Sequence, residues 1–285
     1  MDFKIRLADI PIEVHSQYDS LKEYCKDYVA GADGEKKSSE VNLGQEEHCR
    51  ELMEIRITRA DIEKEQEKVR EDAVETESIE PQYSMQYLET LALLRKIAEE
   101  LPDRDTFLMH GAVISWRGKA YMFTAPSGTG KSTHISLWKK YLGEDVQIIN
   151  GDKPFIAVFE TETRAYGTPW AGKERWQNNT SGTLKGICIL AQAKENKIRR
   201  LSSGESLMYL LRQIHFTENP EKAGHILELV DQMLRQVPVW YLECDISEEA
   251  VKTSFEAMTG EGKWYEETNL LGDEGGISLE RTIQN

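Results

Sequence analysis

The sequence has no long apolar run, no apolar leader segment and no paired-cysteine motif. Nowhere does it reach the roughly 20 consecutive apolar residues of a membrane-spanning helix, and its first residues lack the apolar core of a signal peptide. Its four cysteines, Cys25, Cys49, Cys188 and Cys244, form neither a CxxC pair nor a metal-site spacing with histidine. We therefore expect a cytoplasmic protein with reduced thiols and no membrane partner.

Positive charge is also scarce. The formal net charge is −15 at pH 7, whereas binding to a nucleic-acid backbone depends on clustered Lys and Arg. Nucleic acid is therefore excluded as the main partner. Residues 1–100 hold 14 Lys and Arg against 25 Asp and Glu, but the other 185 residues hold 21 against 25. The second part is the better place for a polyphosphate ligand.

The first part of the chain predicts a small acidic α+β segment, residues 1–82. The composition of the whole chain, 39% hydrophobic and 30% charged, is that of an ordinary globular protein. Residues 3–15 predict a hairpin with its turn at Ala8-Asp9, residues 19–28 a helix, 31–44 a loop and 53–57 a strand. Residues 59–77 are nearly all charged and indicate either an exposed helix or a mobile segment.

From residue 83 to residue 259 strands alternate with helices, which predicts an α/β nucleotide-binding domain. An amphipathic helix is expected over 83–101, and a hairpin turn at Trp116-Arg-Gly. Further strands are expected at 106–114, 119–124, 146–149, 155–159, 186–191 and 239–244, and helices at 133–141, 206–215 (capped by Ser203), 223–236 and 248–258. Residues 260–285 are expected to form a polar tail.

The strongest motif is Ala-Pro-Ser-Gly-Thr-Gly-Lys-Ser-Thr at 125–133, between a predicted strand and a predicted helix. This is the context of a GxxxxGK[ST] phosphate loop. Gly128 and Gly130 permit backbone angles that turn successive N–H groups toward an anion. Lys131 is expected to reach the β- and γ-phosphates and Ser132 to bind Mg²⁺. The predicted nucleotide-binding residues are Ser127, Gly128, Thr129, Gly130, Lys131, Ser132 and Thr133.

Two alternatives accompany this motif. Ala125 stands where the consensus has its first glycine, which is compatible with the motif if that residue is extended. The other interpretation of the segment is a chance glycine-rich turn, which the strand–loop–helix context disfavours.

Asp152 follows the apolar strand at 146–149 and is the candidate acid for the metal; the alternative is a turn residue between Gly151 and Pro154.

Two further groups are candidates for chemistry. His110, beside Gly111 on the predicted strand before the loop, is either an active-site residue or a core histidine, while His134 is expected to be structural. The segment 167–179 is a non-periodic loop in which Lys173 or Arg175 is expected to stabilise charge on a transferring phosphoryl group. In the alternative interpretation, its tryptophans Trp170 and Trp176 pack on the core and its cations form surface ion pairs.

Taken together, these motifs resemble the phosphate-loop fold of the HPr kinase/phosphorylase and PEP-carboxykinase type. They are most similar to small bacterial HPr-kinase-like proteins, some of which modify the precursors of lasso peptides. The resemblance covers about residues 83–258. It rests on His110-Gly111, the loop at 125–133, the strand that ends in Asp152, Gly-Thr-Pro-Trp-Ala-Gly-Lys at 167–173 and Val-Pro-Val-Trp-Tyr-Leu at 237–242.

The resemblance implies a mixed sheet with flanking helices, preceded here by the acidic α+β segment. It implies that Asp152 binds metal and acts as base, and that His110 lies at the active site. HPr kinases carry two adjacent aspartates, and here the first position is Gly151. Asp152 must then combine both roles, or the base comes from elsewhere.

The sequence thus predicts a kinase that uses ATP and Mg²⁺ to phosphorylate a hydroxyl group of a peptide, a protein or a small molecule. The catalytic residues expected are Lys131, Asp152, His110 and Lys173 or Arg175, with Ser132 and Asp152 on the metal. Two alternatives stay open: a nucleotide-binding regulator with little turnover, and a plain ATPase. The donor (ATP, GTP or pyrophosphate) and association into a homo-oligomer also stay open.

Overall fold

The computed structural model describes residues 1–30, 51–75 and 81–261. The loop expected at 31–44, Cys49 and almost all of the tail expected at 260–285 lie outside the described residues. Cys25 and Cys188 are buried and Cys244 is half-buried, and all three are free thiols, as expected. Among the described residues, none of the helices combines the length and the apolar character needed to cross a bilayer.

The N-terminal part forms a three-stranded sheet in the order β1-β2-β3. The predicted hairpin is confirmed: β1 (Asp2–Leu7) and β2 (Ile10–His15) are antiparallel and meet at a turn with left-handed Ala8 (φ 50°) and Asp9 (φ 61°). The strand β3 (Met53–Arg56) adds parallel to β2. The predicted helix at 19–28 is divided into α1 (Ser20–Tyr24) and the short 3-10 helix η1 (Lys26–Tyr28).

Two helices connect this sheet to the rest of the molecule. The charged segment at 59–77 is a helix, α2 (Arg59–Glu75), with Ile62 and Glu65 buried. Arg95 of α3 (Met85–Glu100) donates to Glu65 Oε2 at 2.9 Å, which ties the two helices together. The Ser84 hydroxyl caps α3 by accepting a hydrogen bond from the Tyr87 N–H.

The larger part is a curled, mixed sheet of nine strands flanked by helices, so the α/β class is confirmed. Its main path runs β4-β8-β9-β10-β6-β5-β7. The strand β12 lies off this path, where it pairs with β10 on one side and with β11 on the other. The strands are β4 (Thr106–Leu108), β5 (Ala112–Trp116), β6 (Lys119–Thr124), β7 (Val146–Asn150), β8 (Phe155–Val158), β9 (Thr163–Tyr166), β10 (Ser181–Gln192), β11 (Lys197–Arg200) and β12 (Val239–Cys244).

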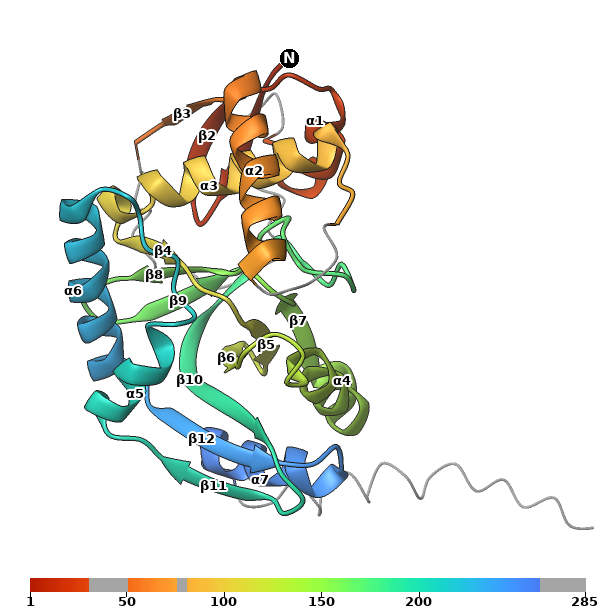
Figure 1. Ribbon diagram of the computed structural model, residues 1–285. Coiled ribbons are helices and arrows are strands. Elements are labelled where there is room, and N and C mark those ends of the chain that lie inside the picture. Colours follow the sequence, from red (N-terminus) through yellow and green to blue (C-terminus); the bar gives the residue numbers. More distant parts are fainter. Residues whose placement is uncertain (31–50, 76–80, 262–285) are drawn as a thin grey trace, which may run out of the picture.

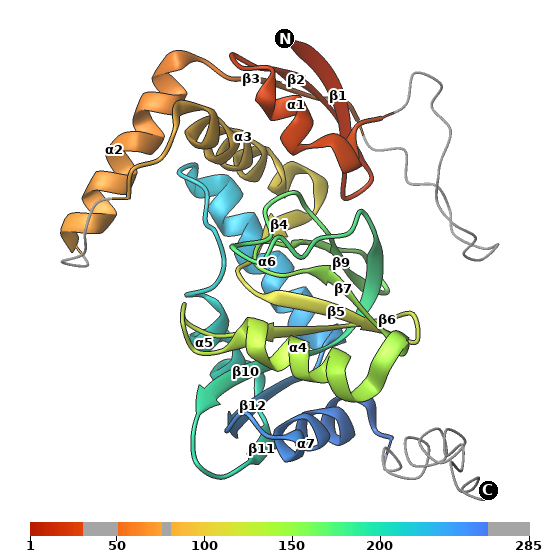
Figure 2. The same ribbon diagram turned by 90° about the vertical axis from the view of Figure 1, so that its right-hand side faces the viewer.

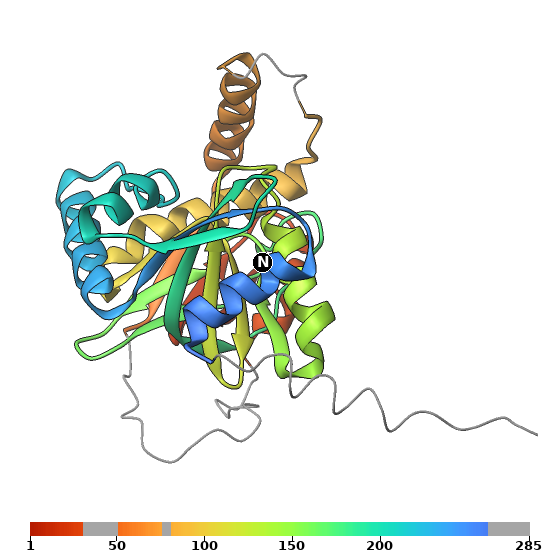
Figure 3. The same ribbon diagram turned by 90° about the horizontal axis from the view of Figure 1, so that it is seen from below.

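Helices cover both faces of this sheet (Figure 1, Figure 3). One face packs against α4 (Lys131–Leu142) and α7 (Glu248–Thr259), which contribute Trp138 and Phe255 to the apolar cluster there. The other face packs against α5 (Ser203–Leu210) and α6 (Pro220–Gln236). Two short 3-10 helices complete the elements: η2 (Pro102–Arg104) follows α3, and η3 (Gly143–Asp145) follows α4.

The two sheets share one apolar core. Side chains of β1–β3, including Ile12, form a single buried cluster with Leu93 of α3 and with Phe155 and Trp170 of the larger part. Figure 2 shows the three-stranded sheet and α3 stacked on the curled sheet. The acidic N-terminal part is therefore in direct contact with the α/β part rather than joined to it only by the chain.

Several elements differ from those predicted. The strand expected at 106–114 is two strands, because β4 pairs with β8 whereas β5 pairs with β6 and β7. His110 and Gly111 lie in the crossing between them, not on a strand. The β5–β6 hairpin at Trp116-Arg-Gly is confirmed, and β7 pairs with the other edge of β5. The helix α5 is capped by Ser202 instead of Ser203 and ends at Leu210, since residues 213–215 pair with residues 108–110.

Candidate functional site

The loop at residues 125–130 connects the end of β6 to the start of α4. Gly128 (φ 79°) and Gly130 (φ 110°) both have left-handed backbone conformations, which favour glycine. A Cβ added at either position would meet nothing within 4 Å, so both glycines are required by conformation and not by crowding. Ala125 is buried and is not among the residues with positive φ, which explains why alanine is accepted at the first consensus position.

The loop forms the N-terminal end of a three-turn helix. Gly130 caps α4 and offers no side chain to its first-turn N–H groups. Such groups carry partial positive charge and favour an anion. The loop is closed by a hydrogen bond from the Thr129 N–H to the Pro126 carbonyl at 3.3 Å, and Gln192 at the end of β10 donates to the Thr129 carbonyl at 3.2 Å. The backbone is thus held in a curve beside a helix N-terminus.

Lys131 is drawn into this loop. Only 7% of the residue is exposed, and its ammonium donates to the carbonyl oxygens of Ala125 at 2.8 Å and Pro126 at 3.3 Å. Burial lowers the pKa of Lys131, the charge of Asp152 opposes that shift and the charge of Lys153 adds to it. The two following residues differ in exposure: Ser132 is half-buried and Thr133 is exposed.

Asp152 and His110 meet although 42 positions separate them in the sequence. His110 Nε2 lies 3.1 Å from Asp152 Oδ1, and the Gly111 N–H donates to the Asp152 carbonyl at 2.8 Å. Gln213, which follows α5, holds the other side of the ring: its Oε1 lies 3.2 Å from His110 Nδ1, and its carbonyl accepts from the His110 N–H at 2.7 Å. His110 is therefore oriented from both sides, with its ring between Gln213 and Asp152.

Asp152 is held as an anion close to cations. Burial raises its pKa, but the His110 hydrogen bond and the charges of Lys153 and His110 outweigh burial, so the pKa is lowered overall. Lys153 Nζ lies 3.4 Å from Asp152 Oδ2, and about a quarter of the aspartate side chain (25%) stays exposed. A charged carboxylate that solvent can reach is able to bind a metal ion.

A buried asparagine positions Asp152. Asn150 is fully buried, and its Oδ1 accepts from the N–H groups of Asp152 at 2.9 Å and Lys153 at 2.7 Å. Its amide nitrogen donates to the Thr168 carbonyl at 3.0 Å. Asp152 therefore lies in a turn, as the alternative interpretation has it, and the same turn presents its carboxylate to His110.

The segment 167–179 folds against this turn. Trp170 is buried and its indole N–H donates to the Thr90 carbonyl at 2.9 Å, so the expectation that it packs on the core is confirmed. Trp176 is half-buried against the cluster beneath α4. Lys173 and Arg175 are exposed, and within the described part of the chain neither forms an ion pair. The structure does not bring these two cations into contact with Asp152 or Lys131.

Glycines set the distance between this segment and Asp152. A Cβ at Gly172 would lie 3.3 Å from Asp152 Cβ. A Cβ at Gly151 would lie 3.0 Å from the Ala171 carbonyl oxygen and 3.4 Å from that of Trp176. The position before Asp152 is therefore crowded by backbone, which gives a physical reason for glycine where the resembling kinases carry a second aspartate.

His134 has the structural role that was expected. It is 3% exposed, its Nε2 lies 3.0 Å from the Ser254 hydroxyl, and its ring packs on Phe123 with centroids 4.8 Å apart. Burial lowers its pKa to about 3, so the ring is neutral. It joins α4 to α7 through the Ser254 hydroxyl.

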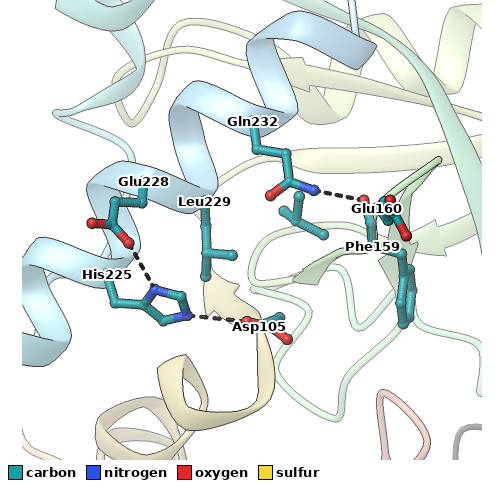
Figure 4. Close-up of a pocket in the computed structure, with 8 residues that line it drawn as sticks. Asp105, Phe159, Glu160, His225, Glu228, Leu229 and Gln232 are labelled. Atoms are coloured by element: carbon teal, nitrogen blue, oxygen red, sulfur yellow. Dashed lines mark hydrogen bonds and ion pairs between the residues drawn. The ribbon is translucent and has the colours of Figure 1, made fainter.

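A separate hollow of about 440 Å³ lies beside α6 (Figure 4). His225 bridges two carboxylates there, with Nε2 at 3.0 Å from Asp105 and Nδ1 at 3.3 Å from Glu228, and Gln232 donates to the Phe159 carbonyl at 2.9 Å. Its acidic lining does not suit a polyphosphate. The glycine loop is the better candidate site because its backbone and cations suit an anion.

Three residues of this site were not predicted from the sequence. Lys153 directly follows Asp152, so adjacency was an available signal. Asn150 precedes Gly151, and an Asn-Gly pair at a strand end is a recognisable turn. Gln213 carried no local signal, since its contact with His110 spans 103 positions. Among the described residues, no group of three or more His, Cys, Asp or Glu is arranged to hold a metal ion.

Comparison with known proteins gives one family. The family model described as SynChlorMet cassette protein ScmC matches residues 77–253, more than half of the chain. No curated protein matches the sequence. Among solved structures, that of the Hpr(Ser) kinase/phosphatase from Coxiella burnetii aligns with 9% sequence identity, 59% of this chain, 99% of the other chain and a TM-score of 0.30.

Proposed function

The chain belongs to the SynChlorMet cassette protein ScmC family, and we propose that it binds a nucleoside triphosphate with Mg²⁺ and transfers the terminal phosphoryl group to a hydroxyl. The curled sheet is then a phosphate-loop core of the HPr-kinase and PEP-carboxykinase type. The acceptor is a peptide, a protein or a small molecule, and ATP is the donor.

One observation carries the proposal: two left-handed glycines and a buried lysine stand at the start of α4. Backbone N–H groups of residues 127–133 would bind the phosphate oxygens, as such loops do. Lys131 would leave the carbonyls of Ala125 and Pro126 for the β- and γ-phosphates. The absence of any atom within 4 Å of Cβ positions at Gly128 and Gly130 supports close approach of a ligand to the backbone.

The residues present suit Mg²⁺. This ion prefers oxygen ligands and is commonly held by one or two protein groups together with substrate phosphates and water. The Ser132 hydroxyl and the Asp152 carboxylate, whose lowered pKa keeps it ionised, are such oxygens. When bound, Mg²⁺ neutralises charge that develops on the phosphate oxygens.

In the transfer step, the acceptor oxygen forms a bond to the γ-phosphorus while the bond from that phosphorus to the β–γ bridging oxygen breaks. The electron pair of the broken bond leaves with the nucleoside diphosphate. The hydroxyl proton passes to Asp152, whose Oδ1 lies 3.1 Å from His110 Nε2. Gln213 keeps the imidazole in place through Nδ1. Positioning and charge neutralisation are the main contributions of a protein to this reaction.

One observation favours a second candidate, a nucleotide-binding regulator with little turnover. Gly151, not a second acid, precedes Asp152, and a Cβ added there would lie 3.0 Å from the Ala171 carbonyl oxygen. A single carboxylate must then serve both the metal and the acceptor. This candidate would bind the nucleotide at the same site as the proposed kinase but would not transfer the phosphoryl group efficiently.

Calorimetry with Mg-ATP tests the proposed nucleotide site. The intact chain should bind Mg-ATP, and Lys131→Ala should weaken binding at least about tenfold, since a charge-assisted contact contributes about 1.5–3 kcal/mol. Lys139→Ala removes an exposed lysine from the last turn of the same helix and is the matched control. Equal binding by Lys131→Ala and the wild type would contradict the site.

Labelled ATP separates the candidate functions. Transfer of ³²P from γ-labelled ATP to an acceptor, lost in Asp152→Asn, identifies a kinase. Phosphate release without an acceptor identifies an ATPase. Binding with neither transfer nor release identifies the regulator.

A further inference from the structure

Lys153 is a cation that the preceding mechanism leaves without a role. Its backbone is fixed at three points: its N–H donates to Asn150 Oδ1 at 2.7 Å and to the Trp170 carbonyl at 3.2 Å, and its carbonyl accepts from the Thr168 hydroxyl at 2.7 Å. Its ammonium lies 3.4 Å from Asp152 Oδ2, and the side chain is 36% exposed. A rigid backbone and a reachable charged end are typical of a ligand-binding lysine.

The charge of Lys153 also acts on the loop. Asp152 and Lys153 are the two groups whose charges shift the pKa of Lys131, so the three side chains occupy one electrostatic neighbourhood. Lys173 and Arg175, the cations first expected to neutralise the phosphoryl group, are exposed and are not among the charges that shift the pKa of Lys131. The structure favours Lys153 over both.

We infer that Lys153 is the second cation of the nucleotide site and binds the terminal phosphate of the triphosphate. The inference rests on the proposed function. Lys131 and Mg²⁺ together would supply about three positive charges to a triphosphate of about four negative charges. The Lys153 ammonium lies beside the carboxylate of Asp152, the proposed metal ligand. Its flexible four-carbon side chain allows the ammonium to move from Asp152 Oδ2 to a phosphate oxygen. Lys131 would then contact the β- and γ-phosphates and Lys153 the γ-phosphate.

Comparison of Mg-ATP with Mg-ADP tests this assignment, because only the triphosphate carries the group that Lys153 would bind. Calorimetry on the full chain should show that Lys153→Met weakens Mg-ATP binding about tenfold to hundredfold and changes Mg-ADP binding less than about twofold. Lys153→Arg, which keeps the charge, should retain most of the preference for ATP. Lys119→Met removes an exposed lysine at the opposite end of β6 and should bind both nucleotides like the wild type.

The outcomes separate the inference from the proposed function. If the wild type binds neither nucleotide, the proposed function fails and the inference fails with it. If the wild type binds both and Lys153→Met keeps the full preference for ATP, the inference alone is overturned. It is equally overturned if Lys153→Met, with an unchanged thermal midpoint, weakens both nucleotides to the same extent. Loss of the preference in Lys173→Met or Arg175→Met, and not in Lys153→Met, would return the role to the loop at 167–179.

Discussion

His134 lies only three residues after Lys131, yet it belongs to the interior. Its ring nitrogen Nε2 is 3.0 Å from the Ser254 hydroxyl, which also accepts from the Trp138 indole at 2.9 Å. One hydroxyl therefore links two side chains of α4 to α7. A buried imidazole without a carboxylate partner is stable only when it is neutral.

Protonation of His134 should make stability depend on pH. Burial lowers its pKa from an ordinary 6.5 to about 3. Between these two pH values the unfolded chain therefore binds a proton at this residue that the folded chain does not bind. The free energy of unfolding should fall as pH drops from 6.5 toward 3, by about 1 kcal/mol per pH unit from this residue. Its contribution is fully present above pH 6.5.

Urea unfolding at about pH 7.5 and about pH 5 measures this effect. His134→Gln keeps a polar group near Ser254 but does not titrate, so its stability should fall less between the two pH values than that of the wild type. Other titrating groups, His215 among them, are common to both proteins and cancel in the comparison. Parallel losses in the two proteins would show that His134 does not titrate as described.

At the scale of an element, the loop at 167–179 is a rigid part of the site. Its start depends on Gly167, where a Cβ would lie 1.9 Å from the Asn178 carbonyl oxygen and 2.7 Å from that of Ile149. Its end depends on Asn178, whose N–H donates to the Ile149 carbonyl at 3.0 Å. Both ends are thus anchored to β7, the strand that leads into Asp152.

Gly167→Ala should therefore disturb the loop and the site together. A methyl group cannot fit 1.9 Å from a backbone oxygen, so the two segments must separate, at a cost of about 3 kcal/mol or more. Denaturant unfolding should report the loss of stability, and calorimetry should report weaker Mg-ATP binding.

The matched control is Gly224→Ala, in the fifth position of α6, where a Cβ would meet nothing within 4 Å. Glycine disfavours a helix interior, so this variant should gain about 0.5–1 kcal/mol and bind nucleotide unchanged. A Gly167→Ala protein as stable as the wild type would show that the loop is not anchored in this way.

Elements with a strong local pattern were predictable from the sequence. The hairpin turn at Ala8-Asp9, the turn at Arg117-Gly118 and the strand–loop–helix around Lys131 were all placed correctly. The strands β9 and β11 were not predicted. β11 (Lys-Ile-Arg-Arg) has one apolar residue among three basic ones, and β9 (Thr-Arg-Ala-Tyr) has no run of β-branched aliphatic residues. The equally short β8 (Phe-Ile-Ala-Val) was predicted because all four of its residues are apolar.

Contacts that depend on strand order were not predictable. The sequence offered Asp152 and His110 as candidate site residues. Their contact depends on the break between β4 and β5, where His110 lies. That break arises because β4 pairs with β8 whereas β5 pairs with β7. Gln213 reaches His110 because α5 ends at Leu210 and residues 213–215 pair with residues 108–110. Tertiary packing decides both, and local propensity carries no information about either.

At the scale of the whole molecule, the two sheets are joined by a common core. Ile12 of β2 is fully buried in the same cluster as Leu93, Phe155 and Trp170. The sequence suggested a boundary at residue 82 between an accessory segment and the nucleotide-binding domain. A shared core of this kind makes independent unfolding of the two parts costly, since either part alone would expose apolar surface.

Ile12→Ala should therefore destabilise the site-bearing part as well as the N-terminal sheet. Removing a buried isoleucine side chain costs about 2–5 kcal/mol. The five tryptophans of the described residues all lie outside β1–β3, at positions 116, 138, 170, 176 and 240. Their fluorescence and the far-ultraviolet circular dichroism should follow one denaturant transition, shifted to lower denaturant in the variant. Two separate transitions, with the tryptophan transition unchanged in Ile12→Ala, would instead establish a domain boundary near residue 82. In one cooperative core, loss of the Ile12 side chain must also lower the stability of the packing around Trp170.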